Sequence, residues 1–231
     1  MKVQPIKTSL FKENGDLFSF LDKHLPQIKN KDVVVITSKI VALSEGRFCV
    51  AKDEKYKEKI IRQESDFAIK TKYAWLTIKD GDVLSSAGID ESNANGKLIL
   101  LPKDCYQSAE IVRDYLLKKY KLKKLGVIIT DSRLMPLRAG VVGISMGYAG
   151  FKGIKNYIGK PDLFDRKFKV SKTDIADSLA TTAVLVMGEG TEKQPLAIIS
   201  DAPIEFINTV NRNELKIDIK DDIYKPLFEK I

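Results

Sequence analysis

Two runs of β-branched residues, each followed at once by polar side chains, constrain the fold of this chain more than any other feature. Residues 32–39 read DVVVITSK, and residues 125–132 read LGVIITDS. Continuous apolar runs of this length are typical of strands that are buried on both faces of a sheet. The first run ends in Ser38 and Lys39 and the second in Asp131. We expect a functional site at these polar strand ends.

Helical and extended patterns alternate along the rest of the chain, without an internal repeat or a low-complexity linker. A glycine-rich segment at residues 140–150 suits strands or turns in close backbone contact rather than a helix. We therefore expect one domain over residues 1–231, with at most two interlocked lobes. The expected helices span residues 17–25, 52–69, 104–120 and from 171–174 to 187, and the expected strands span residues 3–6, 32–37, 73–78, 83–86, 98–101, 125–130 and 196–199.

Composition excludes several classes of protein. The 231 residues are 44% hydrophobic and 30% charged, which is typical of a globular chain that builds a core. No apolar run approaches the roughly 18–20 residues that span a bilayer, and the N-terminus lacks a signal-type segment, so we expect a cytoplasmic protein without a membrane anchor. Cys49 and Cys105 match no disulfide, metal or redox pattern, and we expect packing roles for them. The single histidine, His24, comes near the end of the first expected helix, where it complements the helix dipole, and we expect no histidine-based zinc site.

Three acidic residues are candidates for chemistry because each follows a strand or helix in a polar or glycine-bearing loop. They are Asp90 in GIDESN, Asp131 in ITDS and Glu189 in MGEG. Such carboxylates and hydroxyls suit Mg²⁺ or Mn²⁺ held together with substrate phosphates. Backbone N–H groups of Gly188 and Gly190 offer a phosphate cradle, although Gly188 alone is also a common helix end. An Asp after a strand is equally common as a turn or cap residue, so this pattern leaves both readings open.

Eight ordered segments of the chain carry a family resemblance: VVVITSKIVALSEGR, AGIDESN, LLPKDCYQSAE, GVIITDS, RAGVVGISMGYAG, IGKPDLFDR, ADSLATTAVLVMGEG and PLAII. Through them the chain resembles the coenzyme F420-0:gamma-glutamyl ligase family from about residue 33 to residue 199. No Walker, Rossmann, kinase or GxSxG motif competes with this resemblance.

The resemblance implies a GTP-dependent ligase that joins L-glutamate to a small carboxylate acceptor through an acyl phosphate. It also implies Mg²⁺ or Mn²⁺, a stimulating monovalent cation such as K⁺, and a mixed α+β two-lobed fold assembled as an intertwined homodimer. The implied metal ligands are Asp90, Asp131, Ser132 and Glu189. The expected nucleotide-binding residues are Ser38, Lys39, Asn93, Gly188, Glu189 and Gly190. The expected catalytic residues are Asp90, Asp131 and Arg138, and Lys152 is a further candidate partner for phosphate or carboxylate.

Three departures from the family pattern favour a divergent member with a different acceptor. Leu43 stands where the family commonly has a lysine, residues 133–138 replace a Gly-Arg segment after the metal position, and residues 8–11 replace a proline-containing nucleotide loop. A nucleotide sensor that has lost ligation is therefore the alternative. The net charge of +8 raises a third reading, a nucleic-acid-binding module, which has no other support in the sequence.

Overall fold

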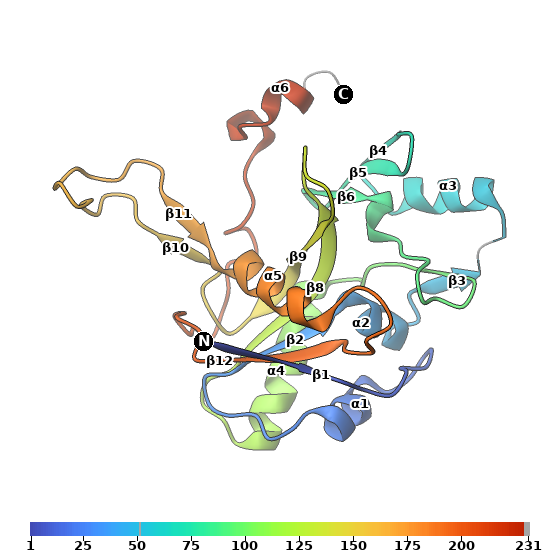
Figure 1. Ribbon diagram of the computed structural model, residues 1–231, viewed down its shortest axis with the longest axis horizontal. Helices are drawn as coiled ribbons and strands as arrows, with labels where there is room; N and C mark the ends of the chain where they lie inside the picture. Colours follow the sequence, from blue (N-terminus) through green and yellow to red (C-terminus); the bar gives the residue numbers. More distant parts are fainter. Residues whose placement is uncertain (51, 229–231) are drawn as a thin grey trace.

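A five-stranded mixed sheet forms the centre of the computed structural model, which describes residues 1–50 and 52–228 (Figure 1). Its strands β2 and β8 are parallel neighbours, and every other pair is antiparallel. The fold class is therefore α+β, as expected. The strands in spatial order are β1 (Lys2–Ile6), β12 (Leu196–Ser200), β2 (Val33–Thr37), β8 (Gly126–Leu134) and β9 (Val141–Ala149).

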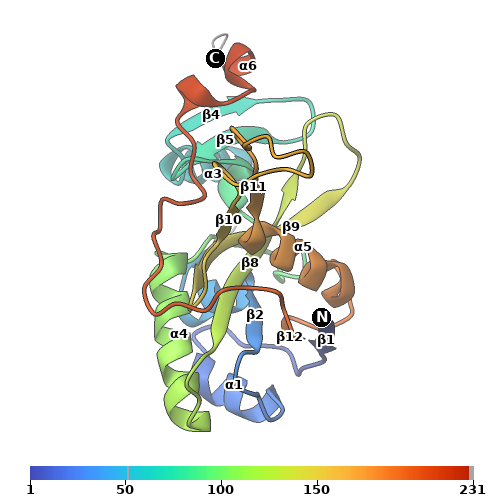
Figure 2. The same ribbon diagram turned by 90° about the vertical axis from the view of Figure 1, so that its left-hand side faces the viewer.

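Helices cover both faces of this sheet (Figures 1 and 2). On one face lie α1 (Leu17–His24) and α4 (Cys105–Tyr120), and on the other lies α5 (Ile175–Met187). Strand β2 supplies Val34 and Ile36 to the first core, and Val33 and Val35 to the second. This alternation explains the continuous apolar run, because a strand with both faces covered has no solvent side.

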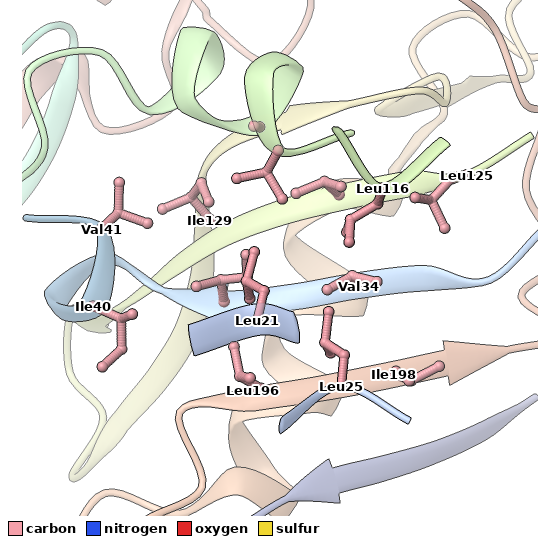
Figure 3. Close-up of a cluster of buried hydrophobic side chains, with 14 of the residues drawn as sticks. Leu21, Leu25, Val34, Ile40, Val41, Leu116, Leu125, Ile129, Leu196 and Ile198 are labelled. Carbon is pink, nitrogen blue, oxygen red and sulfur yellow. The ribbon is translucent and has the colours of Figure 1, made fainter. Parts of the chain in front are cut away.

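The core under α1 and α4 is built from side chains that meet across the sheet surface (Figure 3). Leu21 of α1 is fully buried, and Leu116 of α4 is 1% exposed. Both lie over the sheet face that carries Val34 and Ile129. Burying a leucine side chain of this kind contributes about 1.5–3 kcal/mol.

Aspartates begin all three of these helices. The carboxylates of Asp16, Asp104 and Asp174 accept hydrogen bonds from backbone N–H groups three residues further on. Each bond satisfies a donor that has no partner within the helix. The expected helix start at Asp104 is confirmed, and Asp174 is the residue that caps α5 after the short strand β11 (Lys172–Asp174).

A second set of elements, formed within residues 48–99, lies to one side of the central sheet (Figure 1). The expected helix over residues 52–69 is too long, because α3 ends at Gln63 and Phe67–Lys70 forms a strand that pairs with the next one. The turn at residues 80–81 is confirmed. The elements are β3 (Phe48–Val50), α3 (Glu54–Gln63), β4 (Phe67–Lys70), β5 (Trp75–Lys79), β6 (Asp82–Ser85), η1 (Ser86–Gly88) and β7 (Lys97–Ile99).

The glycine-rich segment forms β9, an edge strand that both α4 and α5 approach closely. A Cβ atom on Gly147 would lie 2.4 Å from the backbone of Cys105, and one on Gly143 would lie 2.4 Å from the side chain of Val184. These glycines are needed for close packing of backbone against helix. Strand β8 does not end at residue 130 as expected. It continues to Leu134 because its last residues pair with β9.

One of the remaining elements, α2 (Ser38–Ser44), contributes Ile40 and Val41 to the core under α1 and α4, and the others are peripheral. The β10–β11 hairpin projects from the body on the side of α5 where that helix begins (Figure 1). Cys105 is buried and Cys49 half-buried, both as free thiols, and His24 ends α1 with its ring 4.7 Å from that of Phe20. Within the described residues, no helix is long and apolar enough to cross a membrane. The last bounds are β10 (Ile154–Asn156), η2 (Ile219–Asp221) and α6 (Lys225–Phe228).

Candidate active site

The parallel register of β2 and β8 brings the two polar strand ends together. Thr37 pairs with Thr130, so the next residues, Ser38 and Asp131, lie side by side. The Ser38 hydroxyl donates to Asp131 Oδ2 at 2.7 Å, and the Ser132 N–H donates to Asp131 Oδ1 at 2.7 Å. Both carboxylate oxygens of Asp131 are therefore held in fixed positions.

The pKa of Asp131 is shifted by its surroundings in the site. Burial raises the pKa of its carboxyl to about 6, and the neighbouring charge of Asp90 acts in the same direction. The hydrogen bonds from Ser38 and Ser132 and the charge of Lys39 oppose this shift. Ionising a buried carboxylate costs free energy in the free protein, and a cation bound beside it would stabilise the ionised form.

Asp90 lies opposite, in the loop between η1 and β7, and faces Lys39 on the first turn of α2. The Lys39 Nζ is 2.6 Å from Asp90 Oδ2 and donates to the Ser92 carbonyl at 2.8 Å. Backbone bonds in both directions between Asp90 and Ile99 fix the loop. Burial favours a higher pKa for Asp90, but the hydrogen bond and charge of Lys39, with the bonds from Ser92, lower the pKa below its usual value.

The loop after α5 forms a third part of the site, next to the Asp131 and Asp90 segments. Gly188 ends the helix with a φ of +82°, which favours glycine, and it places Glu189 so that Oε1 accepts from the Ser132 hydroxyl at 2.5 Å. The Asn93 side-chain amide donates to the Gly190 carbonyl at 3.2 Å. The segments of Asp90, Asp131 and Glu189, far apart in sequence, thus meet at one place.

These side chains line one cavity of about 500 Å³. Nine of the ten expected site residues are on its wall: Ser38, Lys39, Asp90, Asn93, Asp131, Ser132, Gly188, Glu189 and Gly190. Arg138 is not, since it lies in the exposed loop between β8 and β9 and its N–H donates to the Met135 carbonyl. Lys152 lies elsewhere in an ion pair with Glu205 at 2.7 Å. The catalytic role of Arg138 remains a prediction.

Other lining residues were not named as site residues from the sequence. Nine of them come from residues 8–11 and 191–195, which antiparallel pairing of β1 with β12 brings together. Here the Thr8 N–H donates to the Lys193 carbonyl. Ser92, which binds both Lys39 and Asp90, was also missed. Its position two residues after an Asp is the only local sign, because Asp side chains commonly bind the N–H two residues on.

Comparison with known proteins identifies the family. A sequence model of the F420-0:Gamma-glutamyl ligase family matches residues 5–201. The chain belongs to this family. Among its relatives are proteins named coenzyme F420:L-glutamate ligase from Methanococcus maripaludis strain S2 (33% identical, 86% of each chain), Methanocaldococcus jannaschii (32%; 88% of this chain, 82% of the relative) and Archaeoglobus fulgidus (31%; 82% and 83%). The resemblance noted in the sequence is confirmed, and the match includes every segment that lines the cavity.

The charge on the cavity wall bears on the metal expected for a gamma-glutamyl ligase. Two lysines, Lys39 and Lys193, face four acidic residues: Asp90, Asp131, Glu189 and Glu192. A wall with a net negative charge repels a polyphosphate unless cations lie between them. Among the described residues, no three His, Cys, Asp or Glu side chains are grouped to hold a metal by themselves. Oxygen ligands of this kind fit Mg²⁺ or Mn²⁺ shared with substrate phosphates and water.

Proposed function

We propose that this protein is a GTP-dependent ligase that forms an amide between L-glutamate and the carboxylate of a small acceptor. The observation that carries the proposal is the meeting of Ser38–Asp131 with Lys39–Asp90 in one cavity of a gamma-glutamyl ligase family member. The names of the relatives support glutamate as the incoming amino acid.

The triphosphate lies along the polar part of the cavity in this proposal. Lys39 contacts its phosphates, and Asn93 holds the loop of residues 188–190 against them. The Gly190 N–H donates to Glu192 at 2.8 Å, so this N–H must exchange its partner to reach a phosphate. Ser38 keeps the Asp131 carboxylate facing the cavity.

Asp90, Asp131, Ser132 and Glu189 would hold Mg²⁺ or Mn²⁺. When bound, such an ion supplies charge neutralisation at the transferring phosphate and aligns it with the attacking oxygen. Lys39 would then compete with that ion for Asp90. The Ser38 hydroxyl and the Ser132 N–H keep Asp131 oriented throughout.

The reaction balances in two steps. An acceptor carboxylate oxygen attacks the γ-phosphorus, the bond to the bridging oxygen breaks, and GDP leaves with its electron pair. The glutamate amine then attacks the carbonyl carbon of the acyl phosphate, and inorganic phosphate leaves as the amine loses a proton. Water would hydrolyse the intermediate, so the cavity must exclude water at that stage.

Product formation tests this proposal. Purified protein, Mn²⁺, K⁺, labelled glutamate and either GTP or ATP are incubated with F420-0 and with a panel of other small carboxylates. We expect GDP release that is stoichiometric with amide formation, and its loss in Asp131→Asn but not in Lys57→Met. Lys57 pairs with Glu91 outside the cavity wall. Amide formation without nucleotide consumption would refute the proposal.

A nucleotide sensor without ligase activity is the second candidate. It is favoured by Leu43 on the cavity wall, where the family commonly has lysine, and by the altered loop after Ser132, whose Arg138 is not among the lining residues. This candidate predicts metal-dependent nucleotide binding and no amide product with any acceptor.

We propose that the protein assembles as a homodimer. Support comes from the exposed apolar residues at the tip of β8 and β9: Leu134, Leu137 and Val141. An apolar tip of this kind favours burial against a partner. Light scattering after size exclusion is expected to give twice the chain mass of 25.9 kDa, and a monomer at micromolar concentration would contradict it.

A further inference from the structure

We propose that Lys39 is an internal counter-ion that a divalent metal must displace from Asp90 before the ligase cycle begins. In the free protein its ammonium neutralises Asp90, and after displacement it is free to bind phosphate. The inference rests on the proposed function and adds a step of cation exchange that links metal binding to nucleotide binding.

The contacts of Lys39 fill its hydrogen-bonding capacity. Its ammonium lies 2.6 Å from Asp90 Oδ2, 2.8 Å from the Ser92 carbonyl and 3.4 Å from the Ser92 hydroxyl. An ammonium group has three donors, so all are used. Asp90 Oδ1 accepts the Ser92 N–H at 2.6 Å. Each carboxylate oxygen of Asp90 thus has a polar partner before any metal arrives.

Competition follows from this geometry. A metal ion that took Asp90 Oδ2 as a ligand would compete with the Lys39 ammonium for that oxygen, because both cations seek its electron pairs. The Lys39 and Asp90 side chains are 25% and 41% exposed, so ions can reach the pair from the cavity. A metal ion that replaces the ammonium on Oδ2 breaks the Lys39 contact, and this cost weakens the binding of metal alone.

The displaced ammonium needs a new anionic partner. Lys39 and Lys193 are the only Lys or Arg residues on the part of the cavity wall that the structure describes. A phosphate of the incoming nucleotide is the group that suits the freed ammonium. Nucleotide then stabilises the displaced state, and metal and nucleotide strengthen each other's binding by the same factor, since linkage is reciprocal.

Mn²⁺ alone is the probe, with free Mn²⁺ measured by electron paramagnetic resonance in the full-length protein. Lys39→Met removes the charge but keeps the side-chain length. Lys57→Met is the matched control, because the Lys57–Glu91 ion pair has an N···O distance of 2.8 Å and similar exposure, 24% and 47%. Both variants lower the net charge by one. Lys39→Arg keeps a cation at the position, and Asp90→Asn identifies the binding that depends on Asp90.

We expect Lys39→Met to bind Mn²⁺ about tenfold more tightly without nucleotide, and to bind GTP about tenfold more weakly in saturating Mn²⁺. Lys57→Met should stay within about threefold of the unmodified protein in both measurements. Lys39→Arg, which keeps the cation, should differ less from the unmodified protein than Lys39→Met does. Mn²⁺ binding that Asp90→Asn removes but Lys39→Met leaves equal or weaker would overturn the inference and leave the proposed function standing. Absence of Mn²⁺ binding with and without GTP would overturn both.

Discussion

Replacing Asp131 by Asn is expected to stabilise the metal-free protein while it removes activity. In the folded state burial raises the pKa of this carboxyl from 3.8 to about 6. One unit of pKa shift corresponds to about 1.4 kcal/mol, so keeping Asp131 ionised costs the fold at most about 3 kcal/mol. The carboxylate borders the cavity, where water screens it, and we expect about 1–2 kcal/mol.

The amide of Asn has nearly the same shape as the carboxyl group. Its oxygen can still accept from the Ser38 hydroxyl or the Ser132 N–H, so the loss of hydrogen bonds is small. For a domain of this size the gain corresponds to a rise in Tm of about 2–8 °C at pH 8.

The pH dependence separates this cause from a general packing effect. The folded state holds a proton on Asp131 up to about pH 6, whereas the unfolded chain releases it near pH 4. The stability of the unmodified protein therefore falls as pH rises through this window, and the advantage of Asp131→Asn is full above it and absent below it. Thermal denaturation in EDTA at pH 8 and pH 4 measures both values. A variant that is less stable at pH 8, or equally displaced at both pH values, refutes the reasoning.

Three further predictions concern the stability of the fold, and each is measured by urea denaturation. Gly147→Ala should destabilise the protein by about 2 kcal/mol or more, because its Cβ would lie 2.4 Å from the Cys105 backbone; a neutral variant would contradict the close approach of α4 to β9. Leu21→Ala should cost about 3 kcal/mol in the fully buried core, and a cost below 1 kcal/mol would show that this core is loosely packed. Glu214→Ala should cost about 1–3 kcal/mol, because the Tyr148 hydroxyl and a backbone N–H lose their acceptor; the double variant with Tyr148→Phe should recover part of the loss.

Local sequence patterns predicted the helices and strands whose formation depends little on the segments packed against them. The run at residues 33–36 reads as a buried strand because all four side chains are apolar, and Asp104 begins a helix because its carboxylate binds the N–H three residues on. The prediction of a helix over residues 52–69 was wrong for the residues after Gln63. Residues 67–70 form a strand because they pair with Trp75–Ile78, and a tertiary partner overrides local propensity.

The candidate site was predictable as a set of residues but not as a geometry. Asp90, Asp131 and Glu189 were identified from their loops and from the family resemblance, and all three line the cavity. The contacts between them depend on register, because only the pairing of Thr37 with Thr130 sets Ser38 beside Asp131. The attachment of Lys39 to Asp90 has no sign in the sequence, since these residues come from a helix start and a separate loop.

Calorimetric titration of GTP, and then ATP, with and without Mn²⁺ tests the central claim most directly. It is carried out on the unmodified protein and on the Asp90→Asn, Asp131→Asn double variant. The account predicts GTP binding that requires Mn²⁺ and is lost in the double variant, because these two carboxylates are the proposed metal ligands on the cavity wall. Binding of GTP that is equally strong without Mn²⁺, or unchanged in the double variant, would contradict it.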